Sequence, residues 1–129
     1  YVRLLKAELV VRPTFLSYDK AKYPLPDPIY LAYTDNTNII GGSLTDSTGG
    51  VMYASPVIDD IYGQNTYYRF NVTGYINQVL QTPASEKYSL YILDYNAETA
   101  LRMNRLVVAA NENANYITQL QLSVLIVNK

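Results

Sequence analysis

The chain has 129 residues, of which 49% are apolar and 16% charged, so it is long enough for one domain with its own core and too short for two. Its 10 basic and 11 acidic residues give a net charge of −1 without any basic run, which argues against binding to nucleic acid or to an anionic membrane surface. The absence of His and Cys removes the commonest general base, the Cys nucleophile, disulfides and the usual zinc and copper ligands.

The N-terminal segment predicts a strand and then a surface loop. In LKAELVVRP (residues 5–13), apolar side chains recur at every second position and Pro13 ends the pattern, as in a half-buried strand. Lys, Ala, Glu and Leu also favour helices, so a helical turn stays open as the alternative. SYDKAKYPLPDP (17–28) carries three prolines, which predicts a surface loop.

Two further strands are predicted before residue 60. IYLAYT (29–34) has the composition and alternation of a strand. DNTNIIGGSLTDSTGG (35–50) is rich in turn-forming residues and leaves room for a brief strand at 39–40 only. VMYASPVID (51–59) predicts a weaker strand, because Pro56 interrupts it.

The stretch YYRFNVTGYINQVL (67–80) changes its period halfway. Its first half alternates as a half-buried strand does, with one predicted face made of Tyr68, Phe70 and Val72. Its second half places apolar residues at i, i+3 and i+4, the spacing of a helical stripe, at Ile76, Val79 and Leu80. We therefore predict a short helix at about Gly74 to Gln81, capped by Thr73.

The C-terminal third predicts three more strands. KYSLYILDYN (87–96) is apolar on both faces, so we expect a central strand that is covered on both sides. NRLVVAAN (104–111) follows as a strand, but a helix from Glu98 to Ala110 is an open alternative because Ala, Leu, Arg and Met favour it. QLQLSVLIVNK (119–129) alternates clearly and becomes apolar on both sides toward its end.

Together these elements predict a mainly β chain, a single antiparallel and jelly-roll-like β-sandwich over residues 1–129 with one short helix. We interpret it as the C-terminal part of a longer precursor. The last strand, Gln119 to Val127, is too apolar for an open edge, so we expect it to pair within its own sandwich. The alternative is strand exchange, in which it completes a neighbouring subunit as donor strands do in pili.

Catalysis is not expected, because it would have to use carboxylates, Lys, Tyr or Ser. The candidate carboxylates are Asp59, Asp60, Asp94, Glu98 and Glu112. Asp59 and Asp60 would point to opposite faces of an extended chain, so we interpret them as a solvated turn and not as an acid/base pair. DNTN (35–38) and DST (46–48) are interpreted as turns and not as calcium loops, so no cofactor and no metal are predicted.

The 14 tyrosines, against 2 Phe and no Trp, are the most unusual feature of the composition. The C–H face of a sugar packs on an aromatic ring whose hydroxyl group hydrogen-bonds nearby. Tyr67, Tyr91 and Tyr95 are the predicted outward-facing tyrosines and hence the candidate ligand-binding residues. Cross-strand packing on the pleated surface is the alternative that needs no ligand.

Five segments in the same order resemble the C-terminal β-domain of a Bacteroidetes-type family of cell-envelope lipoproteins of unknown function: LKAELVV, YRFNVTGYINQVL, SLYIL, NRLVVAAN and QLQLSVLIV. A looser similarity runs to the DNRLRE-type β-sandwiches, which are grouped with carbohydrate-binding modules. The resemblance covers most of the chain, although residues 17–50 have no counterpart in it. It implies that the short helix closes one open end of the sandwich.

The residues and this resemblance predict a non-catalytic, extracytoplasmic interaction or assembly domain of a bacterial surface lipoprotein. Its expected location is the cell envelope, at the outer-membrane surface or in the periplasm, with membrane attachment only through an anchor outside this chain. The expected partners are other envelope proteins or a surface glycan, and not nucleic acid. The alternatives are a carbohydrate-binding module that uses surface tyrosines and a pilus-like subunit that exchanges its C-terminal strand.

Overall fold

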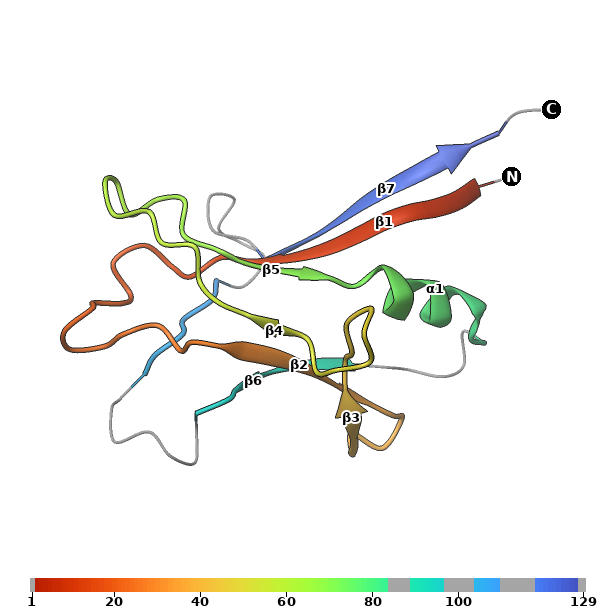
Figure 1. The fold of residues 1–129 in the computed structure, drawn as a ribbon, viewed down its shortest axis with the longest axis horizontal. Coiled ribbons are helices and arrows are strands. Elements are labelled where there is room, and N and C mark those ends of the chain that lie inside the picture. Colours follow the sequence, from red (N-terminus) through yellow and green to blue (C-terminus); the bar gives the residue numbers. More distant parts are fainter. Residues whose placement is uncertain (1, 84–88, 97–103, 110–117, 128–129) are drawn as a thin grey trace.

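The computed structural model of the protein describes residues 2–83, 89–96, 104–109 and 118–127. Two antiparallel sheets face each other, and one short helix lies at one end of the molecule (Figure 1). The chain is therefore mainly β with a sandwich-like arrangement, as predicted.

The first sheet has the strand order β5-β1-β7 and is built around the N-terminal strand. β1 (Val2–Val11) pairs antiparallel with β5 (Tyr68–Asn71) through its second half and with β7 (Gln119–Ile126) along most of its length. The strand predicted within residues 5–13 is thus confirmed over the helical alternative. The last strand pairs with β1 of its own chain, as predicted, but it lies at the end of the strand order, so the prediction that it would not form an open edge is wrong for the described residues.

An irregularity in β1 changes which side chains reach the core. The register with β7 shifts between Leu4 and Lys6, so Leu5 lies in a β-bulge. Ala7 and Val11 are buried on the inner face, whereas Leu5 is exposed and Leu4 packs against the core instead. The prediction that apolar side chains alternate without interruption from Leu5 onward is therefore wrong for Leu5 itself.

The second sheet is built around β2 (Ile29–Thr34), which matches the predicted strand. β6 (Ser89–Asp94) pairs with β2 over all six of its residues and occupies one edge. β3 (Ile40–Ser43) and β4 (Tyr53–Ala54) share the other edge, with β3 beside the end of β2 and β4 beside its start. The chain then crosses to the first sheet, where Val57 and Tyr67 exchange backbone hydrogen bonds of 2.8 and 3.1 Å just before β5.

The prediction that β6 is a central, covered strand is wrong. Within the described ranges β6 pairs with β2 only, and Tyr91 and Ile92, which point to opposite faces, are both exposed. β2 takes the central place and buries Ile29 and Leu31. Apolar residues on both faces of a segment do not by themselves reveal how many neighbours the strand has.

β3 is longer than the brief strand predicted at 39–40, and it includes two glycines. A Cβ atom at Gly41 would lie 2.8 Å from Cε2 of Tyr33, and one at Gly42 would lie 3.0 Å from the Tyr33 hydroxyl oxygen. These glycines therefore let the Tyr33 ring lie directly against the β3 backbone. The sequence suggested a turn, but the glycines provide a close approach of ring and strand.

The core lies between the two sheets and contains residues from distant parts of the chain. Its buried cluster consists of Ala7, Val11, Leu25, Ile29, Leu31, Leu44, Ala54, Tyr68, Phe70 and Val72. The face predicted for the stretch 67–72 is confirmed. The Tyr68 hydroxyl group donates a 2.6 Å hydrogen bond to the buried carbonyl oxygen of Pro26. The prediction that residues 17–28 form only a surface loop is therefore wrong for Leu25 and Pro26.

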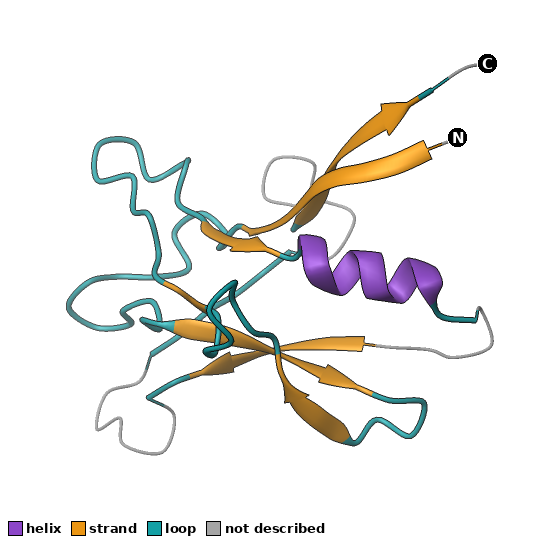
Figure 2. Cartoon of the chain, turned by 45° about the vertical axis from the view of Figure 1, so that its right-hand side comes forward, coloured by secondary structure: helices purple, strands orange, loops and turns teal. Residues whose placement is uncertain are grey.

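The helix α1 (Thr73–Gln81) follows β5 directly and lies at one end of the sandwich (Figure 2). Its bounds match the prediction, but Thr73 is not the cap: Val72 occupies that position. The Thr73 hydroxyl oxygen instead accepts a 2.9 Å hydrogen bond from the Ala7 N–H group and so ties α1 to β1. Ile76 packs against the core, whereas Leu80 is 70% exposed, so the predicted stripe is only partly buried.

Residues 104–109 form an extended segment that joins the N-terminal loop. Val108 bridges to Pro13, and the Thr14 N–H group donates a 2.8 Å hydrogen bond to the carbonyl oxygen of Val107. The helical alternative for Glu98 to Ala110 is thus wrong for the described part, and its remaining residues lie outside the described ranges. No helix within those ranges is long and apolar enough to cross a membrane.

Candidate functional site

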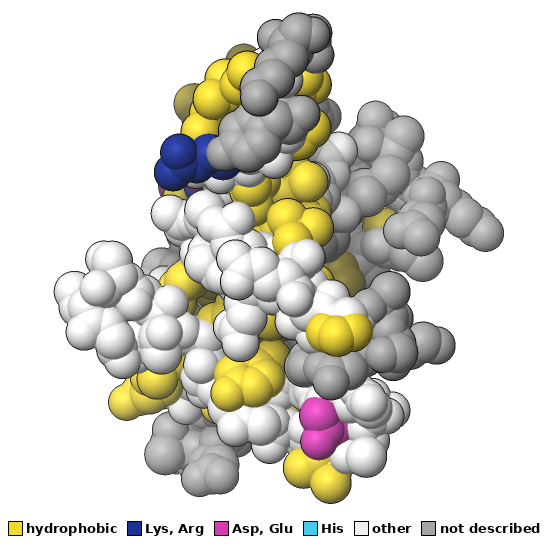
Figure 3. All heavy atoms as spheres, turned by 90° about the vertical axis from the view of Figure 1, so that its right-hand side faces the viewer, with side chains coloured by type: hydrophobic (Ala, Val, Ile, Leu, Met, Phe, Trp, Pro, Cys, Tyr) yellow, Lys and Arg dark blue, Asp and Glu magenta, His cyan; other side chains and the backbone are white. Residues whose placement is uncertain are grey.

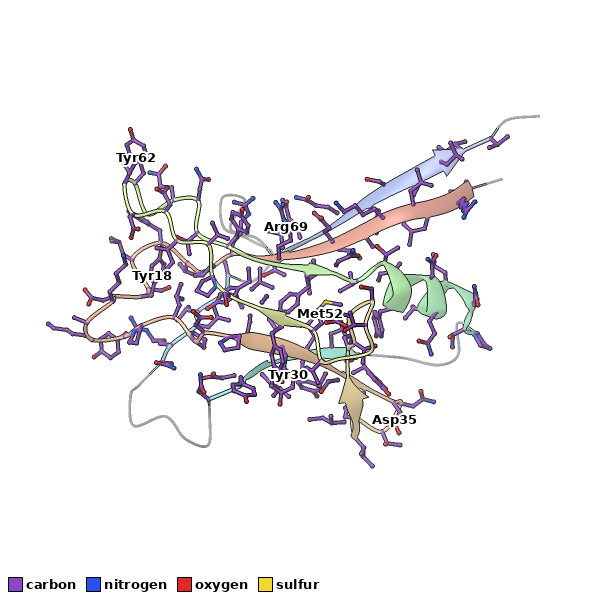
Figure 4. The ribbon with its side chains drawn as sticks, viewed as in Figure 1. Tyr18, Tyr30, Asp35, Met52, Tyr62 and Arg69 are labelled. Atoms are coloured by element: carbon purple, nitrogen blue, oxygen red, sulfur yellow. The ribbon has the colours of Figure 1, made fainter. Side chains whose placement is uncertain are left out.

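A cleft of about 900 Å³ opens between the two sheets on the side where β5 and α1 lie across from β3 and the segment that connects β3 to β4. The first sheet and α1 contribute Arg69, Asn71, Val72, Thr73, Gly74, Tyr75, Gln78, Val79 and Thr82 to its wall. The second sheet and the connecting segment contribute Tyr33, Ser43, Leu44, Thr45, Asp46, Ser47, Met52 and Tyr53. Met52 lies between the sheets in Figure 4. The wall combines aromatic rings with many hydroxyl and amide groups.

The aromatic rings of the cleft are held by contacts that need no ligand. Tyr33 lies against Gly41 and Gly42 and is still 36% exposed. Tyr53 is 48% exposed, and its ring packs edge-on against Tyr30 and Tyr95, with centroid distances of 6.0 and 5.2 Å. The Tyr33 ring is therefore held in place at the cleft, whereas Tyr53 lies opposite Tyr30 in the register, next to the core pair Ile29 and Ala54, so its ring is on the outer face of the second sheet.

The two charged side chains in the cleft wall already have partners. Asp46 Oδ1 accepts hydrogen bonds from the Thr48 hydroxyl group at 2.6 Å and from the Thr48 N–H group at 2.8 Å, and these bonds lower the pKa of Asp46. The Nε atom of Arg69 lies 3.6 Å from Oε2 of Glu8, and the guanidinium carbon of Arg69 is 5.0 Å from the centre of the Tyr67 ring. Thr48 carries no charge, and Glu8 also pairs with Lys6 at 2.8 Å, so the cleft wall keeps one anionic and one cationic side chain.

The three tyrosines predicted from the sequence do not form one platform. Tyr67 precedes β5 in the first sheet and stacks with Arg69, whereas Tyr91 and Tyr95 belong to β6 and the residues just after it in the second sheet. None of these three tyrosines lines the cleft: Tyr67 stacks with the wall residue Arg69, and Tyr95 packs edge-on against Tyr53. Sequence reasoning missed Tyr33, although the Gly41–Gly42 pair in the next strand was a signal of a close ring contact.

Several of the described aspartates act as turn formers. Asp59 accepts hydrogen bonds from four N–H groups of the loop that follows it, those of Ile61, Tyr62, Gln64 and Asn65. The neighbouring Asp60 forms an ion pair with Lys20, so the interpretation of this pair as a solvated turn is confirmed. Asp35 and Asp46 each accept from the Thr two positions later, as turns do.

No group of three or more acidic side chains among the described residues lies close enough to hold a metal ion. Asp94 Oδ1 accepts a 2.9 Å hydrogen bond from the Asn96 N–H group. Glu98 and Glu112 lie outside the described ranges.

A second candidate site is the free edge of β7. β7 lies at the end of the order β5-β1-β7, and every residue from Gln119 to Ile126 is exposed. Its inner face carries Leu120, Leu122, Val124 and Ile126, opposite Leu9, Ala7, Leu4 and Val2 of β1. The outer ends of β1 and β7 extend past the second sheet (Figure 1), and hydrophobic side chains cover much of this arm at the top of Figure 3. Among the described residues, β7 pairs with β1 only, so the strand is apolar, exposed and open on its other side.

No protein-family model, no curated protein and no solved structure matches the chain. The resemblance to envelope lipoproteins therefore stays a prediction from the sequence.

Proposed function

We propose that the chain is a non-catalytic interaction domain that assembles with another protein chain through the free edge of β7. One observation carries the proposal: an exposed eight-residue edge strand without any charge, proline or bulge-forming glycine. Edge strands of soluble proteins are normally protected by such features, because their unpaired N–H and C=O groups recruit other strands. An unprotected edge of this length is suited to β-strand addition.

The partner that fits this edge best is a second copy of the same chain. In an antiparallel pair of β7 strands centred on Ser123, Leu122 of one copy lies opposite Val124 of the other. Leu120 lies opposite Ile126 in the same register, so the apolar inner face continues across the junction. Side chains of like charge do not oppose each other in this pair, because residues 119–127 include no charged residue. The product is one six-stranded sheet with two-fold symmetry.

A lysine on the inner face of β7 tests this proposal. Leu122 is 52% exposed, so Leu122→Lys leaves the charged group in water in the free chain, but pairing would force it between apolar residues. We expect the wild-type chain to dimerise in light-scattering measurements and Leu122→Lys to be monomeric. The matched control is Gln121→Lys on the polar face of the same strand, which should still dimerise. A wild-type chain that is monomeric at every concentration would contradict self-assembly.

The proposed location is the cell envelope, and it rests on the sequence resemblance alone. In that setting the domain would assemble at the outer-membrane surface or in the periplasm, attached by an anchor outside this chain. The full-length precursor provides the test: a signal peptide followed by a lipobox Cys supports this location, and a precursor without either contradicts it.

A further inference from the structure

We propose that two loops at the end of the sandwich opposite α1 insert their exposed side chains into the surface of a zwitterionic lipid bilayer. The loops are residues 14–23, which follow β1, and residues 59–66, which precede β5, and together they are called the loop tip (Figure 1). The arm formed by the outer ends of β1 and β7 lies at the other end of β1. The inference therefore goes beyond the proposed assembly and does not depend on it.

The loop tip carries the three most exposed large apolar side chains of the described residues. Ile61 is 82% exposed, Leu16 80% and Tyr62 73%. The Phe15 ring packs on Gly63, where a Cβ atom would lie 3.3 Å from Cε2 of the ring. Leu16 and Tyr62 are the neighbours of this pair in the chain, so exposed side chains of the two loops lie close together. Such a group of exposed apolar side chains marks a surface for a partner or a membrane.

The backbone at Leu16 is strained without any gain in packing. Leu16 has a φ of +60°, in the left-handed region that a bulky side chain rarely adopts. At the other described positions with a positive φ the chain carries Asn38, Gly49 and Gly63, residue types that tolerate this conformation. A leucine that is both strained and exposed does not serve the core, which indicates a role outside the fold.

The loop tip is held in place by its own hydrogen bonds. Asp59 accepts hydrogen bonds from the N–H groups of Ile61 and Tyr62, at 3.2 and 3.1 Å. The hydroxyl groups of Tyr18 and the buried Thr66 share a 2.6 Å hydrogen bond that joins the two loops. The exposed side chains therefore sit on an ordered backbone, and binding has little further backbone freedom to remove.

The charges around the loop tip balance, which favours zwitterionic headgroups over an anionic surface. Lys20 forms an ion pair with Asp60 across the two loops. The guanidinium carbon of Arg105 lies 4.3 Å from the centre of the Tyr23 ring, so Arg105 belongs to the same region. The basic residues here are Lys20, Lys22 and Arg105, and the acidic ones are Asp19, Asp59 and Asp60. These described residues leave no excess of positive charge to attract anionic lipids.

A bilayer surface fits the loop tip better than a pocket in another protein does. The exposed side chains come from two loops and protrude, as Tyr62 does in Figure 4, and a fluid bilayer accepts such side chains without a matching cavity. Tyrosine suits the boundary between water and lipid, because its ring is apolar and its hydroxyl group stays at the headgroups. With so few apolar side chains the binding is weak and reversible, as it is for a single acyl chain. The loop tip would thus orient a domain that another attachment holds near a membrane.

Vesicles of phosphatidylcholine test the inference. We expect the wild-type chain to co-float with them at millimolar lipid, in low and in high salt alike, because the contact is apolar. Vesicles that also contain anionic phosphatidylglycerol should bind the chain no more tightly. Leu122→Lys should bind as the wild-type chain does, because β7 is not part of the loop tip, and this separates the inference from the proposed assembly.

Three variants assign the binding to the loop tip. Leu16→Asn keeps a residue that tolerates the left-handed backbone, so it should unfold at an unchanged or higher temperature while vesicle binding weakens roughly tenfold. Ile61→Asn should weaken binding by a similar factor without loss of stability, because Ile61 is exposed. The matched control is Leu80→Gln: Leu80 is 70% exposed but lies in α1 at the opposite end, so vesicle binding should not change.

A fluorescent label reports insertion directly, because the chain contains no Cys of its own. Ile61→Cys and Leu80→Cys would each carry an environment-sensitive fluorophore on the new thiol group. On addition of phosphatidylcholine vesicles, we expect the emission of the label at position 61 to shift to the blue and the emission of the label at position 80 to stay unchanged.

Binding that weakens in Leu16→Asn and Ile61→Asn but not in Leu80→Gln, with a blue shift at position 61 alone, supports the inference. A wild-type chain that does not bind phosphatidylcholine vesicles overturns it, as does binding to anionic vesicles only or equal binding by all three variants. A Leu16→Asn variant that unfolds at a lower temperature also overturns it, because Leu16 would then stabilise the fold.

Discussion

Single tyrosines in this chain take three different physical roles. Tyr68 is buried and needs its hydroxyl group to pair the Pro26 carbonyl oxygen. Tyr18 bonds the buried Thr66 hydroxyl group at 2.6 Å. Tyr33 has a partly exposed ring at the cleft, and Tyr53 has one on the outer face of the second sheet. A phenol ring suits all three environments, because it packs like Phe and still satisfies a polar neighbour or water.

Tyr68→Phe should destabilise the fold by roughly 1–3 kcal/mol, since the change leaves the Pro26 carbonyl oxygen buried without its hydrogen-bond donor. Urea unfolding followed by circular dichroism gives the free energy of unfolding. Tyr62→Phe is the matched control, because Tyr62 is 73% exposed, and it should be neutral. Equal stability of the two variants would show that the buried hydrogen bond contributes nothing.

Alkaline pH should destabilise the wild-type chain more than Tyr68→Phe. Burial, followed by the charges of Asp27 and Asp94, raises the pKa of Tyr68 above its ordinary value of about 10. The unfolded chain therefore releases this proton at lower pH than the folded chain. The corresponding stability is complete below about pH 10 and is lost as the pH rises above it. Unfolding free energies of both chains on either side of that pH check this, and parallel curves would contradict it.

At the scale of elements, α1 shows a local conflict between composition and structure. The helix begins with Thr73 and Gly74, neither of which favours a helix, and its N-cap residue Val72 makes no side-chain cap bond. Its position comes from tertiary contacts instead: the bond between Thr73 and the Ala7 N–H group, and the packing of Tyr75 and Ile76 on the core. Packing on the sandwich therefore stabilises α1 more than its own sequence does.

Gly74→Ala should stabilise the chain by about 0.5–1 kcal/mol. A Cβ atom at Gly74 would meet no atom within 4 Å, and Ala loses less conformational entropy than Gly in a helix. Gly63→Ala is the opposite case, because Gly63 has a φ of +66° and its Cβ atom would lie 3.3 Å from the Phe15 ring. Thermal unfolding midpoints should move up for the first variant and down for the second, and the same sign for both would refute the comparison.

The elements that the sequence predicted well are those whose pattern depends on the chain itself. The strands at 29–34 and 119–126 and the change of period at 67–80 follow from side-chain alternation, which the backbone geometry dictates. The bulge at Leu5 and the edge position of β6 depend on partner strands far along the chain. A local pattern carries no information about those partners.

The candidate sites also combine features that a local sequence pattern reveals with features that depend on distant parts of the chain. The sequence showed that the segment from Gln119 to Val127 is apolar, whereas the exposure of this strand depends on which elements lie opposite it. The cleft brings Tyr33, Met52 and Gln78 together from three separate elements or connecting segments, so no spacing in the sequence predicted it. The tyrosine count indicated aromatic surface but not which rings would meet.

At the scale of the whole molecule, β1 holds the first sheet and α1 together. It pairs with β5 on one side and with β7 on the other, and its Ala7 N–H group binds α1 through Thr73. β5 begins 57 residues after the end of β1, and β7 begins 48 residues after the end of β5. Any change that removes one neighbour of β1 therefore affects the whole sandwich and not a single edge.

Deletion of Gln119 to Lys129 should for this reason destabilise the entire chain. The eight residue pairs between β1 and β7 contribute roughly 0.2–1 kcal/mol each, a total of about 2–8 kcal/mol, against a stability of about 5–15 kcal/mol for a typical domain. We expect the truncated chain to unfold at a much lower temperature or to lack a cooperative transition. A synthetic peptide of residues 119–129 should restore the transition by pairing with β1 in trans, whereas the same peptide with Pro at positions 122 and 124 should not. A truncated chain that stays folded with an unchanged midpoint would mean that β7 is dispensable to its own sandwich and that its pairing with β1 stabilises nothing.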